Sequence, residues 1–391
     1  MEKKSSDRLS SLDLLRGLDM VFLTIVGPLV WAIDSGWGLP QGFLYQFTHP
    51  WEGFTAWDII MPLFLFMCGA AIPLSLERRI TKNGGRPDAS YWKHVFGRVA
   101  LLWVLGMVVQ GHLLDFDLME VRPYNNTLQT IAAGYLAMAA LVCAPMKWRI
   151  TVPFACFVLY GLVVHFCGDY SMTGNAAEKV EQAVLSAVLP ADSKAIHEMG
   201  ELGYLGRLHE IGEIHYTWIL TTPMFVFMTA CGYFSTKILQ SSVSPKSRAS
   251  RVAVFGAALL ALGWILAFCG VRMVKHIFAV SFTAQAMGWS CLSLAALYAL
   301  FDIRLADSVA AGRATALLVL FGRTSLLAYL CADVFTPVFT AFGRMFAPGF
   351  VHLFGGWAGP LAAWLASTLL LVAVLKTRYD ALRSRREKCA L

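Results

Sequence analysis

Charged side chains are scarce in this sequence, and their scarcity excludes an ordinary soluble protein. Of 391 residues, only 15% are Asp, Glu, Lys or Arg, whereas 57% are hydrophobic and 13% are aromatic. Soluble globular chains contain about 45–50% apolar residues and about 25% charged ones. The mean hydropathy of +0.60 indicates the same class. The sequence therefore predicts a membrane protein.

Patterns typical of a metal centre, a redox pair or a bound nucleotide are also missing. None of the nine cysteines belongs to a C-x-x-C pair, and most lie in apolar runs, where thiols act as small hydrophobic groups. No glycine-rich phosphate loop is present. His209 and His215, beside Glu210 and Glu213, fit no familiar metal spacing, so no metal is expected. The net charge of +7 comes from short loops between apolar runs, which argues against a nucleic-acid partner.

Apolar runs of about 18 or more residues recur along the whole chain, and each can cross the hydrocarbon core of a bilayer as a helix. We therefore expect an all-α polytopic fold of about ten transmembrane helices, forming a single domain over residues 1–391. The expected spans are residues 12–33, 57–76, 94–114, 127–145, 150–167, 217–236, 251–270, 277–301, 314–341 and 357–376.

The basic residues predict how the chain is oriented. With ten spans, 24 Lys and Arg lie in the loops on the side of the termini, and 7 lie in the opposite loops. Because cytoplasmic loops carry the excess of Lys and Arg, both termini are expected in the cytoplasm, including a basic tail at 376–391. His49 is then expected on the outer side, and the membrane lipid surrounds the spans.

Two loops differ from the rest. Residues 168–216 form a long acidic stretch that is too polar to span, and its mixture of apolar and polar residues favours a partly helical lid on the outer side. Residues 241–248, rich in serine, are typical of a flexible linker, which would allow a division into two helical halves.

A titratable cluster lies in front of the second apolar run. His49 is followed by Trp51, Glu52, Trp57 and Asp58. Such groups at the mouth of a membrane segment are costly unless they face a wet or protein-lined cavity, so they are functional candidates. A carboxylate beside a histidine can orient the ring to draw a proton from a hydroxyl or amine, and the ring can also carry an acyl group. Glu52 and Asp58 are the candidate partners of His49, and the two tryptophans are candidate substrate contacts or belt residues.

The first apolar run opens with a charged triad. Asp13, Arg16 and Asp19 are three residues apart and share a helix face, where each carboxylate can reach the guanidinium. One interpretation is an ion triad that anchors the helix at the interface. The other adds Arg16 as a contact for an anionic group that enters from the cytoplasm.

Further polar groups lie within or beside later spans. Arg323 and Asp333 are expected to pair with residues on neighbouring helices. Lys275 and His276, with Arg272, form a basic cluster on the outer side, where they can clamp a polar substrate or anchor the interface.

Several stretches resemble heparan-α-glucosaminide N-acetyltransferase and its bacterial homologues of unknown function. The stretches are Arg8–Met20, His49–Thr55 with Asp58, Pro62–Phe66 with Gly69, and weaker echoes at Leu128–Gln129, Lys275, Ser281–Phe282, Gly322 and Tyr329.

This resemblance implies a membrane-embedded acetyltransferase with acetyl-CoA as its co-substrate. The acetyl group would pass from the cytoplasmic side to the amine or hydroxyl of a sugar on the other side. His49 would be the catalytic histidine, either as a base or as an acetyl carrier. Arg8, Arg16 and Arg323 are expected to bind the CoA. The chain departs from the family pattern at Gly27, Glu52, Thr130 and Thr324, which leaves the acceptor open.

A transporter for a small sugar or amino sugar is the alternative function. Aromatic residues would stack on the sugar ring, and the charged groups would gate its passage. The compact loops favour a bacterial inner membrane in either case. The oligomeric state is open between a monomer and a homodimer.

Overall fold

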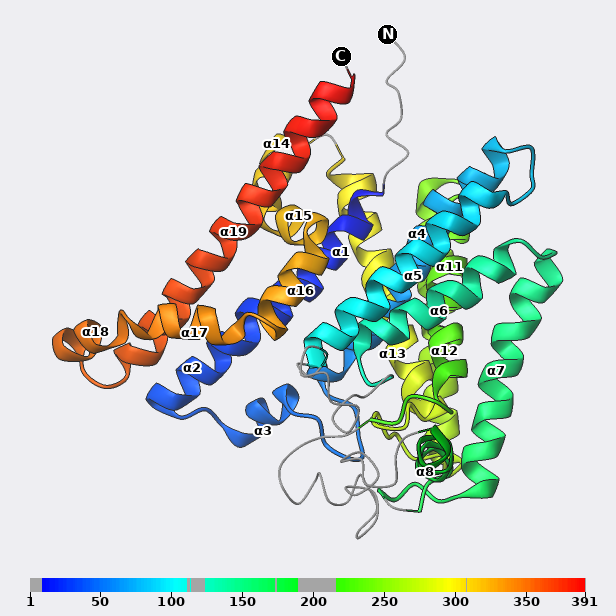
Figure 1. Ribbon diagram of the computed structural model, residues 1–391, viewed down its shortest axis with the longest axis horizontal. Coiled ribbons are helices and arrows are strands. Elements are labelled where there is room, and N and C mark those ends of the chain that lie inside the picture. Colours follow the sequence, from blue (N-terminus) through cyan, green and yellow to red (C-terminus); the bar gives the residue numbers. More distant parts are fainter. Residues whose placement is uncertain are drawn as a thin grey trace. The chain divides into compact units, whose positions relative to one another are not determined.

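The computed structural model describes residues 9–110, 113, 124–172, 174–188, 216–306 and 308–390. These residues form helices joined by loops and contain no strand, which confirms the all-α prediction (Figure 1). Within this part of the chain, seven helices are long and apolar enough to cross a membrane, or eight if one bent pair is a single span.

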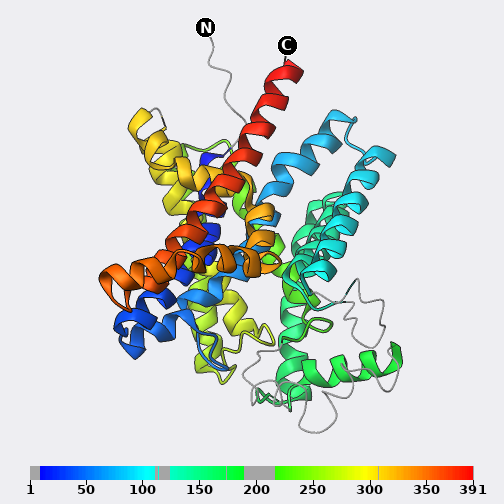
Figure 2. The same cartoon turned by 60° about the vertical axis from the view of Figure 1, so that its left-hand side comes forward.

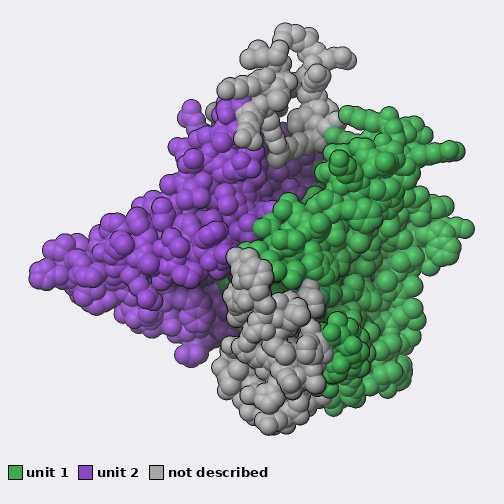
Figure 3. Space-filling view, in the orientation of Figure 1, with its two compact units in different colours: residues 1–8, 49–296 green, residues 9–48, 297–391 purple. Residues whose placement is uncertain are grey.

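The chain forms two compact units (Figure 3). Unit 1 contains residues 49–296, and unit 2 joins residues 9–48 to residues 297–391. Residues 241–248 lie inside unit 1, so the chain is not divided at the serine-rich stretch.

In unit 1, helices α4, α6 and α11 pack against one another, and together with α13 they supply most of the buried residues. The elements of this unit are η3 (Ala56–Ile59), α4 (Ile60–Lys82), α5 (Ala89–Gln110), α6 (Thr127–Val142), α7 (Met146–Cys167), α8 (Ala176–Val188), α11 (Thr222–Leu239), α12 (Pro245–Phe268) and α13 (Val280–Leu297).

Glycines allow α4 and α11 to approach closely. A Cβ at Gly69 of α4 would collide with the carbonyl oxygen of Thr229 on α11, and a Cβ at Gly232 of α11 would collide with that of Phe66 on α4. Small residues on both helices are the usual means of bringing backbones together inside a membrane, where apolar side chains gain nothing by leaving lipid.

Other helices of unit 1 present apolar side chains outward. On α7, Phe154, Leu159 and Phe166 are 60%, 62% and 76% exposed. A row of large exposed hydrophobic residues is rare on a soluble monomer but normal on a helix that faces lipid. This surface agrees with the membrane class that composition predicts.

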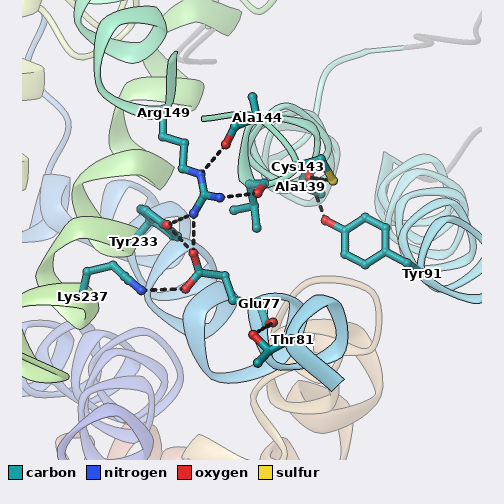
Figure 4. A network of polar contacts seen from close by, with 10 residues as sticks. Glu77, Thr81, Tyr91, Ala139, Cys143, Ala144, Arg149, Tyr233 and Lys237 are labelled. Atoms are coloured by element: carbon teal, nitrogen blue, oxygen red, sulfur yellow. Dashed lines mark hydrogen bonds and ion pairs between the residues drawn. The ribbon is translucent and has the colours of Figure 1, made fainter. Parts of the chain in front are cut away.

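A polar network ties α4, α7 and α11 together at one end of unit 1 (Figure 4). Glu77 accepts from Arg149 at 2.6 Å, from Tyr233 at 2.5 Å and from Lys237 at 2.9 Å. Arg149 also donates to the carbonyl oxygens of Val142 and Ala144. The guanidinium thereby satisfies carbonyls at the end of α6 that have no partner within the helix.

In unit 2, α17 and α18 pack against the long helix α19, which runs out to the C-terminus (Figure 2). The elements of this unit are α1 (Ser10–Val21), η1 (Phe22–Val26), α2 (Gly27–Trp37), α3 (Gln41–Leu44), η2 (Tyr45–Phe47), η4 (Tyr298–Arg304), α14 (Val309–Ala314), α15 (Ala316–Arg323), α16 (Ser325–Asp333), α17 (Thr336–Arg344), α18 (Ala347–Phe354) and α19 (Ala358–Ala390).

Helix α1 is fixed by residues from the far end of the chain. A Cβ at Gly17 would collide with the carbonyl oxygen of Leu318 on α15, and a Cβ at Gly322 would collide with that of Asp13 on α1. The start of α1 lacks a capping side chain of its own. Asp302 replaces it and accepts from the backbone N–H of Ser10 at 3.0 Å and of Ser11 at 2.9 Å. A carboxylate at this end also suits the helix dipole.

Three of the ten expected spans differ in the structure. The span expected at 314–341 is not one straight helix, because α15 and α16 meet at a bend of 78° at Thr324 and α17 follows as a separate helix. The spans expected at 127–145 and 217–236 are helical as α6 and α11, but they are not among the seven candidates. Helix α6 is apolar but has only 16 residues, and both helices are largely buried within unit 1.

Candidate functional site

The segment that carries His49 ends in a tight helical start. Thr55 and Asp58 form a capping box, in which the Asp58 side chain accepts from the Thr55 backbone N–H at 2.9 Å and the Thr55 side chain accepts from the backbone of Asp58. This exchange satisfies two backbone donors at the start of η3 and fixes the Asp58 carboxyl group. Thr55 and Asp58 are fully buried.

Asp58 joins His49 and Lys275 in one cluster, which we call the His49 cluster. The Nδ1 atom of His49 lies 2.6 Å from Oδ1 of Asp58. The Nζ atom of Lys275 lies 3.2 Å from the same oxygen and 3.0 Å from His49 Nδ1. The side chains of Asp58 and Lys275 are 1% and 4% exposed, whereas that of His49 is 23% exposed. The histidine is therefore the member of the cluster that a substrate can reach.

Lys275 lies in a loop whose backbone carbonyls are held by other elements of unit 1. The N–H of Gly53 donates to Met273, the N–H of Thr217 donates to His276, and the hydroxyl of Tyr160 donates to Ile277. Neighbouring chain segments thus fix the loop on several sides. The backbone of the loop makes these anchoring bonds, so the ammonium group of Lys275 does not take part in them.

The same loop contains a strained residue. Phe278 has a φ of 46°, and its ring is fully buried against Phe225 and Phe282. A left-handed backbone is rare for a bulky side chain and costs on the order of 1–3 kcal/mol. The aromatic packing offsets this cost and turns the chain back immediately after Lys275.

Burial governs the charges of the cluster. It lowers the pKa of His49, because a desolvated imidazolium is disfavoured, although the hydrogen bond to Asp58 opposes the shift. Burial also lowers the pKa of Lys275 to about 8, against the attraction of Asp58. At neutral pH the histidine is therefore neutral and the lysine is mostly charged.

These contacts assign the protons on the His49 ring. A carboxylate only accepts hydrogen bonds, so the Nδ1 next to Asp58 carries the hydrogen of the neutral ring. Nε2 is left with its lone pair. The ammonium of Lys275 lies 3.4 Å from Nε2 and brings a positive charge to the same edge of the ring. The cluster can thus take a proton or an acyl group at Nε2 and stabilise a negative oxygen beside it.

Three stacked rings lie beside the cluster. His276 is sandwiched between Trp51, at a centroid distance of 5.0 Å, and Tyr216, at 4.9 Å. The Tyr216 ring also lies edge-on to His49 at 6.4 Å. The sequence predicted that His276 contacts a substrate. His276 is only 3% exposed, so it instead supports the site from within the stack and does not offer its ring face to a substrate.

The remaining predicted residues of this segment are Glu52 and Trp57. Glu52 is not brought to His49; it pairs instead with Arg272 at 3.3 Å, where both side chains are at least half exposed. Trp57 is partly exposed and directly precedes Asp58 in η3. Of the two candidate carboxylates, Asp58 is the one that orients the histidine.

Two of the residues predicted to bind CoA, Arg16 and Arg323, belong to unit 2. Arg16 lies 3.7 Å from Asp13, and Arg323 lies 3.6 Å from the same carboxyl group and donates to the hydroxyl of Tyr379 at 2.8 Å. The expected pairing of Arg323 with a neighbouring helix is confirmed. Asp19 is buried and one of its oxygens has no hydrogen-bond partner, so the triad reduces to one pair. Arg8 lies outside the described residues.

The described parts of the 168–216 loop include helix α8, so this part of the loop is helical, as expected. Its Glu178 and Glu181 are 1% and 2% exposed, so they do not form an acidic outer surface. Glu181 accepts from the backbone N–H of Trp218 at 3.2 Å and of Ile219 at 2.9 Å, and burial raises its pKa to about 7. Residues 189–215, with His209 and His215, lie outside the described residues.

Tyr216 and Thr55 belong to the site, but the sequence did not single them out. Thr55 could have been found, because a threonine three residues before an acidic residue at a helix start is a capping signal. Tyr216 offered no such signal, since its place follows from the bond between Thr217 and the lysine loop. Among the residues that the structure describes, no group of His, Cys, Asp and Glu is arranged to hold a metal ion.

Comparison with known families gives one match. A domain of unknown function, DUF5009, matches residues 8–115, which include His49 and Asp58 but not Lys275. No curated protein matches the chain.

Proposed function

We propose that this protein is an acetyltransferase that moves the acetyl group of acetyl-CoA to the amine or hydroxyl of a sugar. The observation that carries the proposal is the His49 cluster, in which a reachable imidazole is oriented by one carboxylate and faced by one ammonium. The resemblance of residues 8–20 and 49–58 to heparan-α-glucosaminide N-acetyltransferase supplies the reaction class.

The chemistry begins at Nε2 of His49. As a general base, Nε2 takes the proton of the acceptor while the acceptor attacks the acetyl carbonyl, and the thiolate of CoA leaves and is protonated. As a nucleophile, Nε2 attacks the acetyl carbonyl and the CoA thiolate leaves. The acceptor then attacks the acetyl carbonyl on the ring and Nε2 leaves, and the freed ring takes the acceptor's proton and passes it to the thiolate. In both routes Asp58 holds the ring, and the Lys275 ammonium stabilises the oxyanion.

The topology belongs to the same proposal. Ten spans, with both termini in the cytoplasm of a bacterial inner membrane, would place His49 outside, and Arg8, Arg16 and Arg323 would bind the CoA phosphates from the cytoplasm. The guanidinium groups of Arg16 and Arg323, which both lie near Asp13, support this role.

The proposal is tested with purified protein, isotopically labelled acetyl-CoA and a panel of amino sugars. We expect acetylated sugar and free CoA in equal amounts, and no product from His49→Ala. His352→Ala, at an exposed position of unit 2, is the matched control. If wild type forms no product while proteoliposomes accumulate unmodified sugar, the protein is a transporter and the acetyltransferase proposal fails.

A further inference from the structure

Unit 1 contains a cavity of about 740 Å³ that the mechanism above does not use. It lies between two helices that are candidate membrane spans. Leu260, Trp264 and Ala267 of α12 form one wall, and Gln285 and Trp289 of α13 form the other. Its size is that of a site for a small organic molecule.

Close helix packing explains why the cavity is a groove on one side of the helix pair. A Cβ at Gly256 or Gly288 would lie 2.9 Å from the carbonyl oxygen of the other glycine, so the backbones of α12 and α13 nearly touch there. Trp289 directly follows Gly288, and Trp264 lies about two turns further along α12 than Gly256. Their side chains are 47% and 55% exposed. Both helices are apolar enough to face hydrocarbon, so the groove is open to the lipid phase.

The mouth of the cavity is charged. Glu52 and Arg272 line it and form an ion pair at 3.3 Å. The side chain of Glu52 is 50% exposed and that of Arg272 is 62% exposed. An exposed pair of this kind is weak. Arg272 therefore keeps donors for a phosphate group, which a guanidinium binds through two parallel hydrogen bonds.

The cavity and the His49 cluster share a wall. Two chain segments build it, and the bond of 2.8 Å from the Gly53 N–H to the Met273 carbonyl joins them. One segment runs from His49 to the cavity lining at Gly53, and the other runs from the lining at Met273 to Lys275. A molecule whose hydrocarbon chain lies in the groove thus places its head group next to the segments that carry His49 and Lys275.

We propose that the acceptor is an amphiphile, a sugar joined through a phosphate to a hydrocarbon chain, with its chain in this cavity and its phosphate on Arg272. The acceptor role rests on the proposed acetyltransferase, whereas the binding does not. The apolar walls take the chain, the guanidinium takes the phosphate, and the sugar extends toward Nε2 of His49.

Binding is tested with dodecyl phosphate that carries a diazirine on its chain, photolysed with the protein in nanodiscs. We expect labels in residues 260–267 and 285–289 that unlabelled dodecyl phosphate displaces. In Arg272→Gln, dodecyl phosphate should compete about tenfold less well, whereas competition by dodecanol, which has no phosphate, should be unchanged. Ala267→Trp should block the binding of both dodecyl phosphate and dodecanol. The controls are Arg251→Gln and Ala257→Trp, both at exposed positions of α12. Labels spread equally over lipid-facing α7, or competition unchanged in Arg272→Gln, would overturn the proposal.

Activity is tested with the dodecyl phosphodiester of glucosamine against free glucosamine. We expect the diester to have a KM at least about tenfold lower, and Arg272→Gln to raise that KM without changing the one for free glucosamine. If free glucosamine is acetylated equally well, the inference fails and the acetyltransferase stands. If neither is acetylated although dodecyl phosphate binds in the groove, the acetyltransferase fails and the acceptor role fails with it.

Discussion

At the scale of single residues, Asp58 and Glu52 show that two carboxylates in one segment take different roles because their surroundings differ. Asp58 is buried and accepts from His49, Lys275 and the backbone of Thr55. Glu52, six residues earlier, is exposed and pairs with Arg272. The sequence offers both as partners of His49. The capping box, which turns Asp58 inward, decides between them.

Removing either half of the His49–Asp58 pair should stop turnover. We expect kcat to fall by about 10²–10⁴-fold in His49→Ala and in Asp58→Asn, because the first loses the reactive nitrogen and the second loses the carboxylate that fixes its tautomer. Acetyl-CoA binding, measured by calorimetry, should stay near the wild-type value. Asp380→Asn, an exposed change in α19, serves as control; activity within twofold of wild type in Asp58→Asn would remove the dyad from the chemistry.

The rate should depend on pH in a bell shape. The lowered pKa of His49 frees Nε2 already on the acidic side of neutrality, and the pKa of about 8 for Lys275 sets the basic limit, because activity requires the ammonium. The rate should therefore decline as the pH rises through about 8. Lys275→Met should be slower and should lose this basic limb, as a series of initial rates from pH 5 to 10 would show. A basic limb that persists in Lys275→Met would assign it to another group.

The sequence could predict the chemical types in the site better than their arrangement. His49, its carboxylate and Lys275 are all recognisable as polar groups beside apolar runs. Their meeting is not, because Lys275 is 226 residues from His49 and is positioned by backbone bonds to its loop. Those bonds depend on tertiary packing, which leaves no periodic trace in the chain.

At the scale of elements, α8 is tied to the turn before α11 by a buried carboxyl group. The pKa of Glu181 is about 7 in the folded protein against an ordinary value of 4.5. Because this folded pKa is raised, ionisation is disfavoured in the fold. The contribution of Glu181 to the free energy of unfolding is therefore fully present below about pH 4.5 and is lost as the pH rises to about 7.

Glu181→Gln should abolish this dependence. The amide oxygen can still accept from Ile219 but does not ionise, so at pH 8 the variant should be more stable than wild type by up to about 3 kcal/mol. Thermal unfolding in detergent at pH 5 and pH 8 measures the difference, with Asp380→Asn as the control. An equal pH dependence in Glu181→Gln and wild type would contradict the assignment.

The packing of α4 on α11 should tolerate no side chain at its glycines. Gly69→Leu and Gly232→Leu each place atoms on a carbonyl of the partner helix, and we expect a loss of at least about 1–3 kcal/mol in each. Gly97→Leu is the matched control, since nothing lies within 4 Å of a Cβ at that helical position. Urea unfolding in detergent should separate the two classes. Similar midpoints for Gly69→Leu and Gly97→Leu would show that the helices can move apart.

At the scale of the whole molecule, the helical class and most spans follow from composition and run length. The bend at Thr324 does not, because residues 316–333 contain no proline, and the polar residues Arg323, Thr324 and Ser325 are also compatible with a continuous helix. The division into two units cannot be predicted from the sequence either, because unit 2 joins residues 9–48 to residues 297–391, which are far apart along the chain.

The proposed orientation predicts which native cysteines are reached from each side. Cys167 and Cys269 are exposed at ends of α7 and α12 expected outside, and Cys143 is exposed before the start of α7 on the expected cytoplasmic side. In variants that retain one of the three, an impermeant maleimide should label the first two in intact cells and Cys143 only after permeabilisation. The reverse pattern would invert the topology and place His49 in the cytoplasm.

The cap that Asp302 places on α1 has a consequence for biosynthesis. The hydrogen bond to Ser10 joins residues that are 292 positions apart, so α1 leaves the ribosome long before its cap exists. Until α15 follows, Asp13 also lacks Arg323, and the glycine face of α1 lacks its partner. The first helix inserted therefore has its Asp13–Arg16 pair from the start, but it gains its cap and the contact with Arg323 only when residues 302–323 follow. Unit 2 is completed only near the end of translation.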